Sequence, residues 1–163
     1  MEADITVNKI PSVLWTNIFH FSNNGECCGN GDRIPAVYIH KDGYFNIAST
    51  VWNLNKNVNF VIGQKYHLKI QQFQSEEKTI FEVEINGITE YSGEYTHSAR
   101  KSFWNVKVYV SGPWHKPSFT PEYGLLENFK YCQPVEGKQT TQPKICEFIC
   151  MCLHHAKMAK WHT

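Results

Sequence analysis

The chain has 163 residues, of which 42% are hydrophobic and 14% aromatic, enough apolar material for the core of one ordinary domain. Sixteen Lys and Arg residues against fifteen Asp and Glu residues give a formal net charge of +1. This balance excludes the strongly basic character typical of nucleic-acid-binding proteins and gives no reason to expect an anionic membrane as partner. No apolar run approaches the roughly 20 residues of a membrane-spanning helix, so we expect no membrane span.

The start of the chain and its cysteines point to different compartments. The first residues, MEADITVNKIPS, contain neither the basic nor the apolar segment of a signal peptide. The cysteines form an even number, which suits a secreted protein with disulfides; they are Cys27, Cys28, Cys132, Cys146, Cys150 and Cys152. A fragment of a secreted protein and a free-standing intracellular protein both remain open.

Strand and turn signals alternate from Trp15 onward. In WTNIFHFSNNGECCGNGDRIPAVYIHKDGYFNI, apolar segments flank a loop rich in Gly, Asn and Asp and then the Asp42-Gly43 dipeptide. Asn86-Gly87 separates IFEVEI from ITEYSG in the same way. Both dipeptides favour the positive φ angles of two-residue hairpin turns, so we expect a hairpin at each.

Apolar and polar residues alternate with period two in three further segments, which predicts half-buried antiparallel strands. These segments are 66–71, 81–86 and 105–110. The segment from Ser111 to Tyr123 is rich in Pro and Ser and predicts a long surface loop before a last strand, LLENFKY. Many short strands joined by Gly, Pro and Asn turns predict an all-β fold, an antiparallel β-sandwich or jelly roll, over residues 1–131.

The composition changes after Tyr131. Residues 132–145 are polar and rich in turn formers, which is typical of a linker. Residues 146–163 form a short tail rich in Cys and His that we expect to be irregular or weakly helical.

Five segments, in their order along the chain, resemble the laminin G-like, concanavalin A-like jelly-roll superfamily; they are PSVLWTNIFHFS, GDRIPAVYIHKDGYFNI, GQKYHLKIQQ, TIFEVEINGITEYSG and FWNVKVYVSGPW. The nearest likeness is to extracellular GDR-I-P modules of invertebrate adhesion-type proteins, over about Asp4 to Tyr131. The resemblance implies two stacked antiparallel sheets, an extracellular location, and glycan or matrix protein bound on the concave face or the loop rim. Such modules begin with an additional strand that pairs near the last one. Because little precedes Ile5, we expect that strand to be missing.

The loop from Asn23 to Arg33 is the candidate metal site. Glu26, Asn30 and Asp32 offer the hard oxygen ligands that calcium prefers. The alternative is a structural pair of Asp32 and Arg33 that fixes the loop. The structural pair is favoured, because calcium wants more carboxylates than this loop alone supplies.

Aromatic residues beside polar ones are the candidate ligand site. Sugars stack their C–H faces on aromatic rings, while their hydroxyl groups need polar partners. Trp52 and Trp114 lie in polar loops, and Tyr109 shares a strand face with Asn105 and Lys107. We therefore predict that Trp52, Trp114, Tyr109 and Asn105 contact the ligand. Trp15 and Trp104 are expected in the core, where Trp is a normal residue of β-sandwiches.

Two other chemistries are less favoured. Glu82 and Glu84 point to one strand face, as the paired carboxylates of a glycoside hydrolase do, but the turn at Asn86-Gly87 takes the place of a further acid. Tail residues Cys146, Cys150, Cys152, His154 and His155 could hold zinc or copper, but a second pair of ligands is absent. The sequence thus predicts a non-catalytic module that binds glycan or extracellular protein; the alternative is a structural adhesion or spacer domain.

Overall fold

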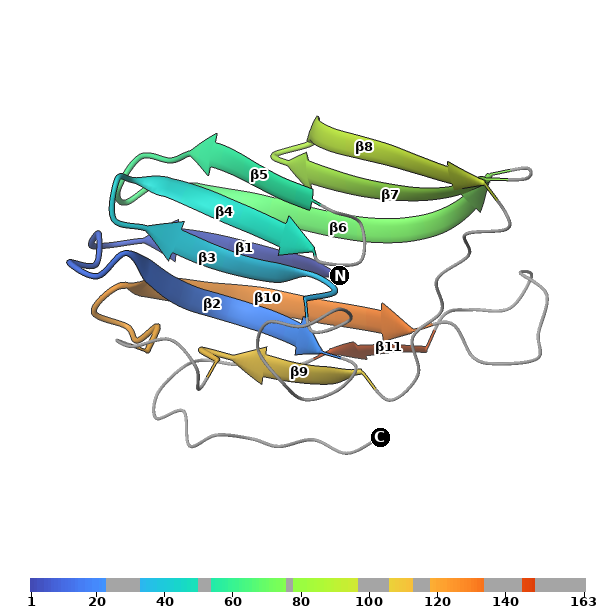
Figure 1. The fold of residues 1–163 in the computed structure, drawn as a ribbon. Helices are drawn as coiled ribbons and strands as arrows, with labels where there is room; N and C mark the ends of the chain where they lie inside the picture. Colours follow the sequence, from blue (N-terminus) through green and yellow to red (C-terminus); the bar gives the residue numbers. More distant parts are fainter. Residues whose placement is uncertain are drawn as a thin grey trace.

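The computed structural model describes residues 1–22, 33–49, 54–75, 78–96, 106–112, 118–133 and 145–148. Their strands form two antiparallel sheets that lie one behind the other (Figure 1), which confirms the all-β sandwich. The six-stranded sheet has the order β11 (Ile145–Phe148), β10 (Gly124–Gln133), β1 (Glu2–Val7), β6 (Lys65–Ser75), β7 (Lys78–Ile85) and β8 (Ile88–Thr96). The five-stranded sheet has the order β5 (Leu54–Asn59), β4 (Tyr44–Ser49), β3 (Ala36–His40), β2 (Trp15–Ser22) and β9 (Lys107–Val110).

The core lies between the sheets and follows from the alternation in the sequence. Successive side chains of a strand point to opposite faces, so every second residue can be apolar and buried. On the six-stranded sheet, the burial of β1 alternates strictly along its length. The largest fully buried apolar side chains come from both sheets: Phe19, Phe21, Phe129, Ile5, Ile18, Ile39, Ile47 and Leu126.

Both predicted hairpins are present, with different loops. Asn86 and Gly87 have φ angles of 53° and 77°, so β7 and β8 are joined by the expected two-residue turn with two positive φ values. Between β3 and β4 the loop has three residues, 41–43, and Gly43 has a φ of 86°. The Asp42-Gly43 dipeptide thus marks the hairpin correctly but belongs to a longer turn.

The expectation that the first strand is missing is wrong. β1 lies between β10 and β6 in the middle of the six-stranded sheet and pairs with both. Its alternation of Ala3, Ile5 and Val7 with polar residues places three fully buried side chains in the core. At the other end of the chain, β10 continues to Gln133, and β11 pairs with it, Cys146 opposite Cys132. The sheet therefore includes the first residues of the expected linker and of the expected tail.

A β-bulge in β2 decides which residues face outward. The register of β2 against β3 shifts between Asn17 and Phe19, so Ile18 and Phe19 both enter the core while Trp15 pairs with His40 on the outside. The buried Asn17 amide fixes the bulge: its Nδ2 donates to the carbonyl oxygens of Phe19 and Val37, at 3.1 and 3.3 Å. Its Oδ1 accepts from the Gly112 N–H at 2.7 Å.

The two sheets are also joined at one edge. β5 and β8 are the edge strands on the same side of the sandwich (Figure 1). An ion pair of 3.4 Å between Lys56 Nζ and Glu90 Oε2 connects them. The faces that remain for a ligand are the outer faces of the two sheets and the loops at their ends.

Candidate functional site

The outer face of the five-stranded sheet carries aromatic and uncharged polar side chains together with one lysine. We call it the amide face; its outward positions are Trp15, His20 and Ser22 on β2, Ala36, Tyr38 and His40 on β3, Tyr44, Asn46 and Ala48 on β4, Asn55, Asn57 and Asn59 on β5, and Lys107 and Tyr109 on β9. Cross-strand pairing arranges them in rows, of which one runs from Tyr38 through Asn46 to Asn57. The register, more than the chain order, therefore assembles this surface.

An aromatic group occupies one end of the amide face. The His40 ring lies between two others: its centroid is 4.3 Å from that of Trp15 and 4.4 Å from that of Tyr44, with which it is stacked. His40 Nδ1 lies 3.2 Å from the Asp42 backbone nitrogen and 3.4 Å from Asp42 Oδ2, so Asp42 contacts the ring through both groups. Trp15 and Tyr44 are only half-buried and leave part of their apolar rings accessible.

This arrangement corrects the expectation that Trp15 belongs to the core. Trp15 packs against Ala36, Tyr38 and Ala48 on the amide face. Uniform alternation from Phe21 and Phe19 back along β2 would place Trp15 inside. The bulge shifts the alternation of inward and outward side chains by one residue, so Trp15 points outward.

An amide group lies beside the aromatic group, on β4 and β5. The Asn46 side chain is buried, and its Nδ2 donates to Oδ1 of Asn55 at 2.5 Å and to Oδ1 of Asn57 at 2.7 Å. Asn55 and Asn57 are exposed. Asn46 thus uses both of its amide hydrogens to hold two exposed amides in fixed orientations.

The centre of the amide face is closely packed. His20 and Tyr38 are 0% and 3% exposed, and Tyr38 Oη lies 3.5 Å from His20 Nδ1. The Arg33 guanidinium stands over the Tyr38 ring, 5.8 Å from its centroid, at cation–π distance. Burial raises the pKa of the Tyr38 phenol, although the charge of Arg33 acts in the opposite direction. The accessible parts of the face are therefore its β5 side, the aromatic group and the half-buried side chains of β9.

Carboxylates are distributed unequally between the two sheets. The strands of the five-stranded sheet contain no Asp or Glu. All carboxylates that lie in strands of the described structure belong to the six-stranded sheet: Glu2, Asp4, Glu82, Glu84, Glu90, Glu94, Glu127 and Glu147. The near-zero net charge of the chain hides this difference.

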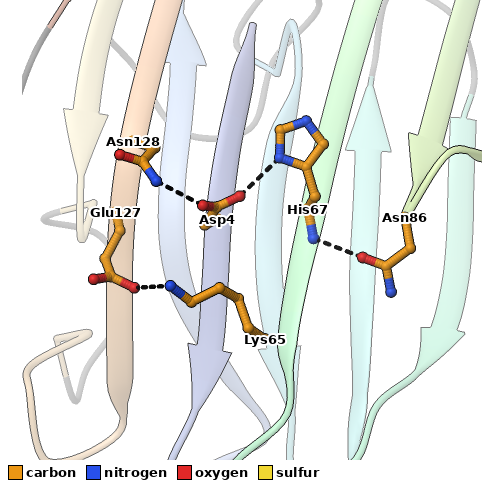
Figure 2. A network of polar contacts seen from close by, with 6 residues as sticks. All are labelled: Asp4, Lys65, His67, Asn86, Glu127 and Asn128. Carbon is orange, nitrogen blue, oxygen red and sulfur yellow. Dashed lines mark hydrogen bonds and ion pairs between the residues drawn. The ribbon is translucent and has the colours of Figure 1, made fainter.

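The outer face of the six-stranded sheet carries several ion pairs. Figure 2 shows its centre, where the Asp4 carboxylate lies between two neighbouring strands and accepts from His67 Nδ1 and from Asn128 Nδ2, both at 2.7 Å. Burial raises the pKa of Asp4, but these hydrogen bonds and the charges of His67 and Lys65 outweigh it, so the pKa lies below its ordinary value. Lys65 in turn pairs with Glu127 at 2.8 Å.

The carboxylates Glu82 and Glu84, weighed above as a hydrolase pair, belong to this ion-paired face. Glu84 accepts from Lys69 Nζ at 2.8 Å, and Gln71 Nε2 donates to Glu82 at 2.7 Å. The hydrogen bond from Lys69 is the main cause that lowers the pKa of Glu84. A glycosidase acid needs a raised pKa, and this shift has the opposite direction.

Most of the site residues predicted from the sequence lie outside the described residues. This applies to the calcium candidates Glu26, Asn30 and Asp32 and to the ligand candidates Trp52, Asn105 and Trp114, as well as to Trp104. Tyr109 is described: it lies half-buried on the amide face, opposite His20. Its role as a ligand contact stays a prediction. Three His, Cys, Asp or Glu residues placed to hold a metal ion do not occur within the described ranges.

Sequence reasoning missed the amide group. The alternation Asn55, Asn57, Asn59 in β5 is a visible signal that three amides share one face. Asn46 was not recognised, because its contact with them depends on the pairing of β4 with β5.

The fold and the site define an antiparallel β-sandwich with an amide-rich outer face whose strands hold no carboxylate. Comparisons of the chain with protein-family models, with curated proteins and with solved structures find no match. Among the described residues, no helix has the length and apolar character needed to cross a membrane.

Proposed function

We propose that this protein is a non-catalytic, extracellular binding module of the laminin G-like type that recognises a glycan on the amide face and the adjoining loops. The observation that carries the proposal is the pair of exposed amides, Asn55 and Asn57, held by Asn46 beside the half-exposed rings of Trp15 and Tyr44. Aromatic faces for C–H groups and oriented amides for hydroxyl groups are the two contacts that a sugar requires.

The predicted loop contacts are compatible with this location. Trp52 precedes Asn55 by three residues, so its Cα lies within about 11 Å of that of Asn55, whatever the loop conformation. Asn105 precedes β9 by two residues, and Tyr109 lies within β9. We infer that Trp52 adds an aromatic contact at the β5 side and that Asn105, Tyr109 and Trp114 bound the site on the β9 side.

A glycan array probed with the parent chain and with four variants tests the proposal. Trp15→Ala and Tyr44→Ala remove the aromatic group, and Trp52→Ala and Trp114→Ala remove the predicted loop contacts. We expect at least one glycan to bind the parent and to lose most of its signal with Trp15→Ala and with Trp52→Ala. Absence of any glycan signal from a folded parent chain would favour the structural spacer instead.

A matched control separates this site from the other sheet. Phe73 is an exposed aromatic residue of β6 in the six-stranded sheet. Phe73→Ala should leave glycan binding unchanged. Equal losses for Phe73→Ala and Trp15→Ala would contradict binding on the amide face.

A further inference from the structure

The orientation of the amides at the β5 side selects for hydrogen-bond acceptors. Because Asn46 Nδ2 donates to Oδ1 of both Asn55 and Asn57, these two oxygens are turned toward the sheet. The Nδ2 groups of the two exposed side chains are then the groups available to a ligand, and neither donates to another described residue. An Nδ2 group donates two hydrogen bonds and accepts none.

The spacing of the two donors also suits one ligand. Asn55 and Asn57 are two residues apart on one face of β5, which places their Cα atoms about 7 Å apart. Both belong to the edge strand of the sheet, so a ligand reaches them without crossing the packed centre.

The charge of the surroundings gives the sign of the ligand. The five strands of this sheet hold no carboxylate, whereas Lys107 lies on the amide face beside Ser22 and the Arg33 guanidinium stands over Tyr38. Tyr38 and Asn57 belong to one row and are separated by two strand spacings, about 10 Å. This distance exceeds the Debye length of about 8 Å at physiological ionic strength, so the positive charge acts on β5 mainly at low salt. The sign of the ligand therefore follows from the strands themselves, which hold no carboxylate that would repel an anionic group at β5.

We propose that the β5 side of the amide face recognises an anionic group of an acidic glycan, a uronate carboxylate or a sulfate ester, through Nδ2 of Asn55 and Asn57. The inference rests on the proposed glycan binding and names its substrate class. The anionic oxygens accept from the two oriented donors, and hydrogen bonds with an ionised acceptor are about twice as strong as neutral ones. A neutral hydroxyl group at the same position makes weaker hydrogen bonds with the two donors.

Matched pairs of glycans test the proposal with the full chain of 163 residues. Oligogalacturonate against its neutral methyl ester isolates the carboxylate, and dextran sulfate against dextran isolates the sulfate ester. Affinity is measured by calorimetry at low and at physiological salt. We expect one charged member to bind at least tenfold more tightly than its neutral partner, with an advantage that shrinks as salt rises.

Two substitutions of the same chemistry then locate the anionic group. Asn57→Asp replaces an oriented donor by an acceptor with negative charge. Asn59→Asp adds the same charge two residues away on the same face, at an exposed side chain that Asn46 does not hold. We expect Asn57→Asp to weaken binding of the acidic glycan about tenfold or more, and Asn59→Asp to weaken it much less.

The outcomes separate the two proposals. Preference for neutral over acidic glycans overturns this inference and leaves the proposed function intact, and equal losses for Asn57→Asp and Asn59→Asp overturn the specific role of the Asn57 donor. If neither kind of glycan binds a folded chain, both proposals fail. A charged glycan that binds the parent and not Asn57→Asp supports both.

Discussion

Single residues set the pH range in which the six-stranded sheet is most stable. Asp4 accepts from His67 and Asn128, and these contacts connect β1 with both of its neighbours. Because the folded-state pKa of Asp4 lies below its ordinary value of 3.8, the network stabilises the folded state above that pH. The stabilisation is lost as the pH falls through the folded-state pKa.

Asp4→Asn tests this network. The neutral amide keeps the shape but cannot accept from both partners as a carboxylate does, so we expect a loss of about 1–3 kcal/mol at pH 7. Urea unfolding between pH 2 and pH 7 should show a smaller fall in stability with acid for Asp4→Asn than for the parent. Glu122→Gln, which removes the exposed pair with Lys9, is the control and should leave the profile unchanged. Parallel profiles for Asp4→Asn and the parent would contradict the role of Asp4.

Gly124 is a residue at which close packing leaves no room for a side chain. A Cβ there would overlap the Thr6 carbonyl oxygen and lie 2.9 Å from Phe119 Cζ. We expect Gly124→Ala to destabilise the fold by about 3 kcal/mol, measured by urea unfolding. At Gly63 the space is open but φ is +81°, so Gly63→Ala should cost only about 1 kcal/mol. A smaller loss at Gly124 than at Gly63 would show that the β1 and β10 backbones can separate.

At the scale of the element, Asn17 maintains the bulge that turns Trp15 to the amide face. Asn17→Ala leaves the Phe19 and Val37 carbonyl groups and the Gly112 N–H without their partner in a buried position. We expect a loss of roughly 2–4 kcal/mol in unfolding free energy and a change in Trp15 fluorescence. Asn8→Ala removes one exposed hydrogen bond and serves as the control. An Asn17→Ala protein of parental stability would mean that the bulge persists without the amide.

The elements differ in how far the sequence predicts them. Local sequence predicts the strands in which apolar and polar residues alternate without interruption, such as β7. It also predicts the hairpin at Asn86-Gly87. β1 has the same period, but it is short and makes its pairs with β6 and β10, more than 50 residues away. β11 depends in the same way on pairing with β10 across a turn-rich segment.

The candidate site also combines residues that local sequence predicts with residues whose position depends on strand pairing. The three amides of β5 can be placed on one face from the sequence alone. The contact of Asn46 with two of these amides depends on the register of β4 against β5. The position of Trp15 on the same face depends on the bulge in β2, and local sequence patterns reveal neither feature. Sequence reasoning therefore favoured conspicuous loop tryptophans over an inconspicuous asparagine within a strand.

At the scale of the whole molecule, the two sheets have different surfaces. The six-stranded sheet carries both signs of charge, neutralised in pairs such as Lys69 with Glu84 and Lys65 with Glu127. The five-stranded sheet has amides and aromatic rings and no carboxylate in its strands; Lys107 lies on its outer face, whereas Lys56 pairs with Glu90 of β8. A face whose charges already pair with one another offers little to a charged ligand, so the asymmetry favours one face for binding.

Hydrogen–deuterium exchange tests this asymmetry across the molecule. When an acidic oligosaccharide occupies the β5 side of the amide face, the backbone amides of β4 and β5 should exchange more slowly, because the ligand restrains the edge strand. Those of β7 and β8 should keep their rates, although β8 is also an edge strand and lies on the same side of the sandwich. Protection of both edges would indicate that the ligand bridges the sheets at the Lys56–Glu90 pair, and protection of β8 alone would contradict binding on the amide face.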